Sequence, residues 1–266
     1  TDISSNVLYY NSLSGQGCVN NIDDVTGFGA WRWSNTPPGG QWSENAGLIQ
    51  SETPENGFML MEADFYNTNP QNNVGVGEVG ENPIYSTFTI GPIDLSVSET
   101  DQLVLQFYSY YRICCTPSGQ GTNDLNVYIG TPDPNYTIYW ADLDYIEGNA
   151  YETNTEKNTL SQIPLKDFSP VSENVYIKFE WIGTHYFWMI DDISITQRPQ
   201  NDLKIQSSWL TMDNPEYIEY YSIPISQMPD QMFIGTEVYN YGYSNEYEAN
   251  LVGTINGNEG SIIESI

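Results

Sequence analysis

Short runs of alternating apolar and polar residues dominate this chain, and they constrain its fold more than any other feature. Clear examples lie at 103–111, 125–130, 175–181 and 187–195. Alternation with a period of two is typical of a β-strand with one buried face. No window carries an apolar stripe with the 3.6-residue period of a helix. The sequence therefore predicts an all-β protein built as β-sandwiches.

Turn residues divide the strand pattern into two series, with the boundary near Arg198 and Pro199. We expect a jelly-roll β-sandwich over residues 1–197 and an immunoglobulin-like β-sandwich that begins over residues 199–266. Since an immunoglobulin-like sandwich needs about 100 residues, the second domain is predicted to be incomplete. We expect the chain to be the front piece of a longer protein.

The charge of the chain excludes several classes of partner. It carries 35 Asp and Glu against 7 Lys and Arg, a net charge of −28. Without a basic stripe to neutralise phosphates, we expect no nucleic-acid binding. No apolar run approaches 18 residues, so we expect no membrane insertion. The first residues lack the basic and apolar regions of a signal peptide, as in a mature chain.

Cysteine and histidine restrict the chemistry further. Cys18, Cys114 and Cys115 allow at most one intramolecular disulfide, and adjacent cysteines rarely bridge each other. A bridge from Cys18 to Cys114 or Cys115 and three unbridged, buried cysteines both remain open. His185 is the only histidine, which excludes a multi-histidine metal site in this chain. Its place between two strands indicates a turn or surface residue.

Several ordered segments resemble known secreted modules. In the first 197 residues these are IQS at 49–51, NGFML at 56–60 with EAD at 62–64, IDLS at 93–96 with the strand at 103–111, and WMIDDISI at 188–195. Together they resemble the MAM-like, choice-of-anchor J and cleaved-adhesin jelly-roll modules that Bacteroidota export by type IX secretion. The segments 202–205, 221–227 and 238–242 are similar to the CARDB-like, immunoglobulin-like modules that follow such jelly rolls. The resemblance implies a secreted, cell-surface protein.

The resemblance also implies a structural calcium ion. In the family, Ca²⁺ often lies between the strand equivalent to 62–64 and a terminal strand with two aspartates. The candidate ligands here are Asp64 with Asp191 or Asp192, together with Glu62. Calcium takes six to eight oxygen ligands. Because neighbouring side chains of a strand point to opposite faces, the two aspartates reach one site only across a bulge. Backbone N–H groups and loop amides are the alternative partners of these acids.

The same acids raise a catalytic alternative. Glu62-Ala63-Asp64 resembles part of the Glu-x-Asp-x-x-Glu strand of laminarinase-like hydrolases, but Asn67 stands where the third acid is needed. The chain also lacks a Gly-x-Ser-x-Gly nucleophile motif. We therefore expect a protein that is not an enzyme.

Aromatic residues gather in several short segments. Exposed rings can stack on sugars, but alternating tyrosines on a sheet usually pack across strands, so packing is the expected role. The residues concerned are Trp31, Trp33, Trp42, Tyr108, Tyr110, Tyr111, Tyr136, Tyr139, Trp140, Tyr239, Tyr241 and Tyr243.

These observations predict a non-catalytic extracellular module that acts in adhesion or surface-structure assembly within a larger secreted bacterial protein. One alternative is a carbohydrate-binding module of a secreted hydrolase. Another is a polymerising surface-filament subunit that exchanges strands through open sheet edges. The corresponding partners are a glycan, a cell-surface protein or further copies of the chain.

Overall fold

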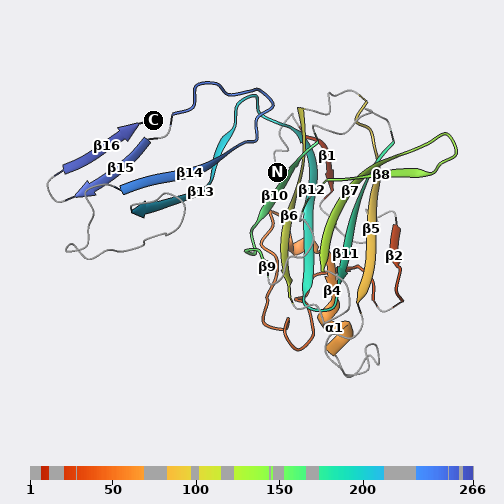
Figure 1. The fold of residues 1–266 in the computed structure, drawn as a ribbon. Coiled ribbons are helices and arrows are strands. Elements are labelled where there is room, and N and C mark those ends of the chain that lie inside the picture. Colours follow the sequence, from red (N-terminus) through yellow and green to blue (C-terminus); the bar gives the residue numbers. More distant parts are fainter. Residues whose placement is uncertain are drawn as a thin grey trace. The chain divides into compact units, whose positions relative to one another are not determined.

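A computed structural model of the chain describes residues 7–11, 21–27, 29–68, 83–96, 102–114, 123–143, 145, 153–165, 174–212, 232–250, 252–257 and 260–265. The chain divides into two compact units, Thr1–Gln197 and Arg198–Ile266. Nearly all regular structure is β, and the described strand pairs are antiparallel (Figure 1). The prediction of an all-β, jelly-roll fold is confirmed.

Two sheets form the first unit. The seven-stranded sheet has the order β10-β6-β12-β4-β3, with β1 paired to β12 and β9 to β6. Its strands are β1 (Val7–Asn11), β3 (Arg32–Ser34), β4 (Phe58–Glu62), β6 (Leu103–Ile113), β9 (Thr153–Asn154), β10 (Leu160–Pro164) and β12 (Phe187–Gln197). The five-stranded sheet has the order β2-β5-β11-β7-β8. Its strands are β2 (Asn21–Asp24), β5 (Ile84–Ile93), β7 (Asp124–Pro132), β8 (Ile138–Asp142) and β11 (Val175–Gly183).

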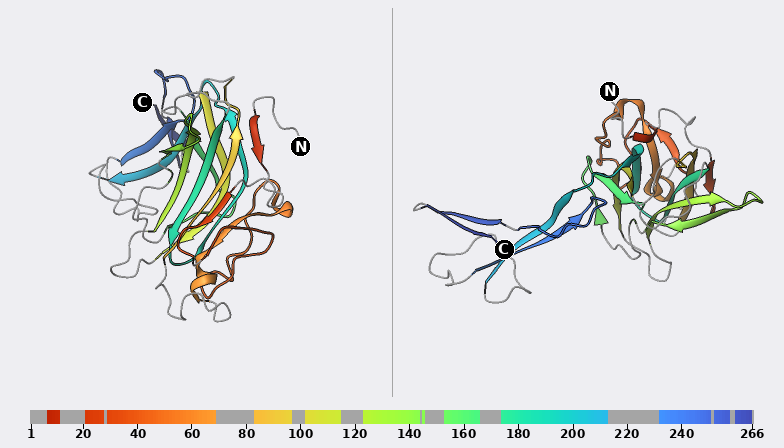
Figure 2. Two further views of the ribbon diagram at one scale, coloured as in Figure 1. Left: turned by 90° about the vertical axis from the view of Figure 1, so that its right-hand side faces the viewer. Right: turned by 90° about the horizontal axis from the view of Figure 1, so that it is seen from above.

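Alternation along the strands places one set of side chains between the two sheets. Aromatic rings fill the centre of this core: Phe88 stacks on Phe179 with ring centroids 4.8 Å apart, and Trp31 meets Phe88 at 4.8 Å. On β11 the core residues alternate with partly exposed ones over most of the strand, as predicted. On β12 nine consecutive residues are buried, because other parts of the unit cover both faces of this central strand. Figure 2 shows the strands of the five-stranded sheet side by side.

The segment after β4 differs from the sequence prediction. Residues Ala63–Thr68 form a short helix, α1, so Asp64 lies on a helix and not on a strand. A single turn of 3₁₀ helix at Pro54–Asn56 precedes β4. Six residues are too few to show an apolar stripe of helical period, which explains why the pattern missed α1. Among the described residues, no helix combines the length and apolar character required to cross a bilayer.

The second unit contains two strand pairs. Strands β13 (Leu203–Met212) and β14 (Met232–Asn240) pair with each other, and β15 (Val252–Gly257) pairs with β16 (Gly260–Ser265). Arg198 closes the unit at one end by donating Nε to the carbonyl of Tyr241 at 2.8 Å and Nη2 to that of Gly242 at 2.6 Å. These pairs are compatible with an immunoglobulin-like module, which stays a prediction.

Candidate functional site

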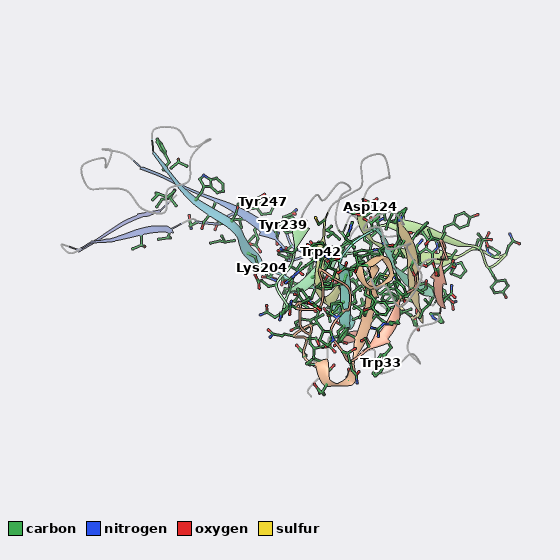
Figure 3. All side chains as sticks on the ribbon, turned by 90° about the horizontal axis from the view of Figure 1, so that it is seen from below. Trp33, Trp42, Asp124, Lys204, Tyr239 and Tyr247 are labelled. Carbon is green, nitrogen blue, oxygen red and sulfur yellow. The ribbon has the colours of Figure 1, made fainter. Side chains whose placement is uncertain are left out.

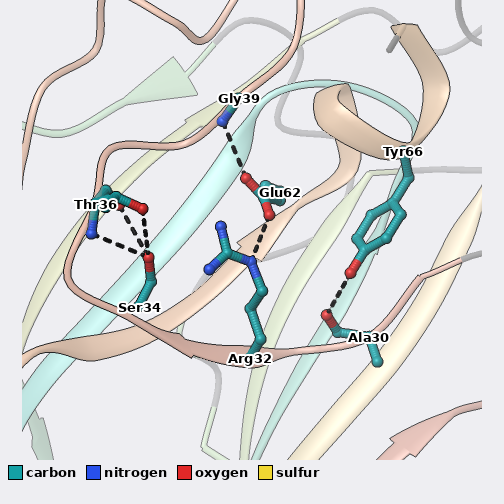
Figure 4. Close-up of polar contacts among 7 residues, drawn as sticks. All are labelled: Ala30, Arg32, Ser34, Thr36, Gly39, Glu62 and Tyr66. Atoms are coloured by element: carbon teal, nitrogen blue, oxygen red, sulfur yellow. Dashed lines mark hydrogen bonds and ion pairs between the residues drawn. The ribbon is translucent and has the colours of Figure 1, made fainter. Parts of the chain in front are cut away.

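Two of the four predicted calcium ligands hold the start of one loop. Glu62, the last residue of β4, accepts from Arg32 Nε at 2.6 Å and from the backbone N–H of Gly39 at 3.0 Å (Figure 4). Asp64 accepts from the backbone N–H of Trp42 at 2.7 Å. Both acids are buried. Their oxygens therefore accept hydrogen bonds from other residues of the chain.

The other two predicted ligands hold the end of the same loop. Asp191 Oδ2 accepts from the Ser51 hydroxyl at 2.6 Å. Asp192 accepts from the Thr53 hydroxyl at 2.6 Å and from the Thr53 backbone N–H at 3.0 Å. The pairing of β12 with β6 shifts between Asp191 and Ser194, and Asp192 has a φ of 48°. Neighbouring side chains of a regular strand point to opposite faces, and this bulge lets both aspartates reach the same segment of the loop.

Asp191 is an unusual carboxyl group. Burial, aided by the negative charges of Asp192 and Glu55, raises the pKa of Asp191 to about 8, although the Ser51 hydrogen bond acts in the opposite direction. The group is therefore mostly protonated at pH 7. A cation that bound here would first have to displace this proton.

The structure does not bring the four acids into a single metal site. The backbone N–H of Asp64 donates to the carbonyl of Tyr186 at 3.1 Å. Asp191 follows Tyr186 by five positions of extended chain, which is about 16 Å. This is far more than the 2.3–2.6 Å at which each calcium ligand must lie from the ion. The described residues contain no cluster of three or more His, Cys, Asp or Glu side chains that could hold a metal. A shared site for Asp64 and Asp191 or Asp192 does not fit, and calcium binding stays a prediction for the latter two alone.

The four acids instead fix the segment 35–57, which we call the covering loop. It packs over the outward face of the seven-stranded sheet. Its Ala46 and Ile49 bury an apolar cluster with sheet residues, namely Phe58, Leu60, Tyr110, Phe187 and Met189. The Tyr110 hydroxyl also donates to the carbonyl of Ala46 at 3.1 Å. A second, smaller core thus lies outside the sandwich.

This burial argues against the catalytic alternative. Glu62 and Asp64 are 1% and 0% exposed, so a substrate cannot reach them. Asn67, at the position of the missing third acid, is also buried and donates to the carbonyl of Thr184.

The outward face of the five-stranded sheet is different, because it carries polar and aromatic side chains that stay partly exposed. We call the central part of this surface the open face. It comprises Tyr85 on β5, Asn126 and Tyr128 on β7, Trp140 on β8, and Lys178 and Glu180 on β11.

Glu180 organises the open face. The residue is 4% exposed, and its carboxylate accepts three hydrogen bonds, from the Tyr85 hydroxyl at 2.8 Å, the Tyr128 hydroxyl at 2.8 Å and Asn126 Nδ2 at 3.0 Å. Burial and the hydrogen bond to Glu180 raise the pKa of Tyr85 to about 12, and the same causes raise that of Tyr128. Both tyrosines are therefore neutral donors, and Glu180 fixes the position of their rings.

Lys178 lies between two rings of the open face. Its Nζ is 4.2 Å from the centroid of Tyr128 and 4.7 Å from that of Trp140. Burial lowers the pKa of Lys178, while Glu180 and Asp142 act in the opposite direction. The Trp140 ring lies across Gly130, where an added Cβ would be 2.7 Å from the ring. Gly130 therefore lets Trp140 lie against the sheet.

The hairpin that joins β7 to β8 extends the open face. It projects away from the two sheets (Figures 1 and 2). Tyr136 at its turn is 89% exposed and Tyr139 is 67% exposed. The prediction that packing explains these two residues is wrong, because the hairpin reaches beyond the core that would bury them. Tyr110, Tyr111 and Trp31 are buried, as predicted.

Three further sequence predictions have mixed outcomes. Trp42 is 49% exposed on the covering loop (Figure 3), so it does not fill the core. His185 lies in the turn between β11 and β12 as expected, but it is buried and its Nδ1 is 2.9 Å from the Thr184 hydroxyl. Cys114 is disulfide-bonded, whereas Cys18 and Cys115 lie outside the described residues.

Sequence reasoning missed five residues of the open face: Tyr85, Asn126, Tyr128, Lys178 and Glu180. A signal was present, because the non-core positions of 175–181 hold a tyrosine, a lysine and a glutamate instead of the small polar residues of an ordinary solvent face. Which side chains of other strands lie beside them depends on strand order and register, which local patterns do not contain.

Comparison with known proteins yields only distant likenesses. No family model and no curated protein matches the chain. The CBM22-1 xylan-binding domain from Paenibacillus barcinonensis Xyn10C is 10% identical, with 72% of this chain and 94% of that chain covered and a TM-score of 0.33. The enzymatically active domain of bacteriophage CBA120 tailspike protein 4 is 12% identical, with coverage of 70% and 20% and a TM-score of 0.34. A module specific for non-crystalline cellulose, CBM28, is 10% identical, with coverage of 63% and 88% and a TM-score of 0.30. Likenesses at this level carry no argument about function.

Proposed function

We propose that this chain is a non-catalytic, extracellular binding module that holds a carbohydrate chain on its open face. The observation that carries the proposal is the set of three hydrogen bonds to Glu180, which fixes the rings of Tyr85 and Tyr128. Tyr128 in turn lies with Trp140 against the Lys178 Nζ. Rings fixed before binding lose little conformational entropy when a ligand stacks on them. Fixed aromatic rings with polar groups between them are suited to the apolar faces and hydroxyl groups of sugars.

Adhesion is compatible with this proposal, because a module that binds a glycan attaches its protein to any surface bearing that glycan. Secretion by the type IX route and membership of the MAM-like and CARDB-like families remain proposals that rest on the sequence resemblance.

The test is binding of neutral polysaccharides to residues 1–266, measured by affinity electrophoresis in gels that contain glucomannan, galactan or mixed-linkage β-glucan. We expect at least one polymer to retard the protein. Trp140→Ala should weaken that binding at least about tenfold, equivalent to 1.4 kcal/mol.

Trp42→Ala is the matched control, since it removes a half-exposed tryptophan from the covering loop on the other sheet. It should leave retardation unchanged. Absence of retardation by every polysaccharide, or equal effects of Trp140→Ala and Trp42→Ala, would overturn the proposal.

A further inference from the structure

The turn of the β7–β8 hairpin is held firmly by one side chain. Asp133 Oδ1 accepts from the backbone N–H groups of Asn135 and Thr137, both at 2.8 Å. The backbone N–H of Asp133 donates to the carbonyl of Thr137 at 2.8 Å, and that of Tyr136 donates to the carbonyl of Asp133 at 2.9 Å. These bonds define the conformation of the residue at the centre of the turn.

That residue, Tyr136, is a poor choice for the stability of the turn. Its φ is 65°, in the left-handed region where Gly and Asn are favoured and bulky side chains are disfavoured. Because its side chain is 89% exposed, burial within the chain does not compensate for this conformation. A disfavoured backbone conformation that carries an exposed aromatic ring indicates a role in binding.

Charge restricts what this region can bind. The stretch 132–142 contains Asp133 and Asp142 but no Lys, Arg or His. Lys178 is the only basic residue in the five strands of the sheet, and its Nζ already lies against two rings. The whole chain has a net charge of −28. An anionic polymer would be repelled over the whole approach.

We infer that the ligand is an uncharged, extended polysaccharide that continues from Trp140 on the open face to Tyr136 at the hairpin turn. The inference rests on the proposed function and specifies its ligand class. The two residues are four positions apart, a span of up to about 13 Å for a fully extended chain. Short oligosaccharides that occupy only the open face therefore do not reach Tyr136.

The test uses isothermal titration of residues 1–266 with the retarding neutral polymer and with its disaccharide. Tyr136→Asn removes the ring and suits the left-handed conformation. We expect a five- to tenfold loss of affinity for the polymer, the range of about one aromatic contact, and no change for the disaccharide. The melting temperature should stay equal or rise by about 2 °C. A residue with only a structural role would lower it.

Two variants serve as controls. Tyr136→Phe keeps the ring and should keep polymer affinity. Tyr139→Asn removes an exposed ring that points to the opposite side of β8 from Trp140, and it should also keep polymer affinity. Alginate and polygalacturonate are the anionic probes, and we expect neither to bind.

The outcomes separate the inference from the proposed function. If polymer binding depends on Trp140 but Tyr136→Asn leaves it unchanged, the inferred contact with Tyr136 is wrong, while binding on the open face is supported. If an anionic polymer binds through Trp140 as tightly as a neutral one, the ligand class is wrong. If no polysaccharide binds, both the inference and the proposed function fail.

Discussion

The outward faces of the two sheets in the first unit differ, because one is covered by a loop and the other stays partly exposed. On the seven-stranded sheet, the outward residues Phe58, Leu60 and Met189 are apolar, and the covering loop buries them. On the five-stranded sheet, Tyr128 and Lys178 occupy the outward positions and stay partly exposed. Buried acidic side chains form hydrogen bonds on both faces. Four of them anchor the covering loop, whereas Glu180 orients exposed rings.

The comparison shows that the role of a buried acid in this protein depends on which groups donate hydrogen bonds to it. Burying a carboxylate is unfavourable unless hydrogen bonds compensate for its lost hydration. At Glu62 the donors come from a loop that closes a small core. At Glu180 they come from side chains that remain available on the surface. Only the second arrangement presents a surface suited to a ligand.

The largest expected effect is the fall in stability when the covering loop loses its hydrogen bond to Glu62. Glu62→Ala leaves Arg32 and the Gly39 N–H without their acceptor, and we expect a destabilisation of about 3 kcal/mol. The corresponding fall in melting temperature is about 6–12 °C. Glu44→Gln, an exposed acid on the same loop, is the control and should shift it by less than about 1 °C. Equal melting temperatures for wild type and Glu62→Ala would contradict the anchoring role.

A second prediction concerns pH. The pKa of Asp191 is about 8 in the folded chain and about 3.9 in an unfolded one, so the folded state binds the extra proton between these values. Stability contributed by this group is present at low pH and is lost as pH rises towards 8, by up to about 1.4 kcal/mol per pH unit.

Urea unfolding in EDTA between pH 5 and pH 8 measures this slope. Wild type should lose stability with rising pH relative to Asp191→Asn, which cannot ionise. Parallel curves for the two proteins would show that Asp191 titrates normally.

The open face can be tested independently of the loop. Glu180→Gln keeps the size of the side chain but replaces one acceptor oxygen with a donor, so the three hydrogen bonds cannot all persist. We expect about 1 kcal/mol of destabilisation and weaker retardation by the polysaccharide, measured together by melting and affinity electrophoresis. Tyr85→Phe, which removes one donor, should have a smaller effect. Full polysaccharide affinity in Glu180→Gln would show that the rings do not need Glu180.

The smallest expected effect concerns calcium. Because Asp64 is hydrogen-bonded to Tyr186, which is about 16 Å along the extended chain from Asp191, Asp64→Asn should not alter any rise in melting temperature produced by millimolar Ca²⁺ over EDTA. Asp192→Asn should abolish such a rise. A calcium-dependent shift that disappears in Asp64→Asn would contradict the separation of the two pairs of acids.

The second unit offers a further contrast with the sandwich. Residues opposite each other in β13 and β14 share a face, so Ile205 and Val238 lie together, and both are exposed. The other side of this pair carries polar and aromatic residues, including Lys204, whose Nζ lies 4.6 Å from the Tyr241 ring centroid (Figure 3 labels Lys204). This amphipathic pattern agrees with the strand predictions at 202–205 and 233–240. It does not by itself identify an immunoglobulin-like module.

The sequence by itself determined the all-β class and the approximate positions of β4, β6, β7, β11 and β12, because period-two alternation is a local property of each strand. It also identified the need for a bulge at Asp191 and Asp192, since alternation forbids neighbours from facing one way. Tertiary structure decided the rest. The roles of Glu62, Glu180 and Asp191 depend on donors up to 140 positions away in sequence, and the exposure of Tyr136 depends on how far its hairpin extends beyond the core. Strand order and register bring such partners together, and no local pattern encodes them.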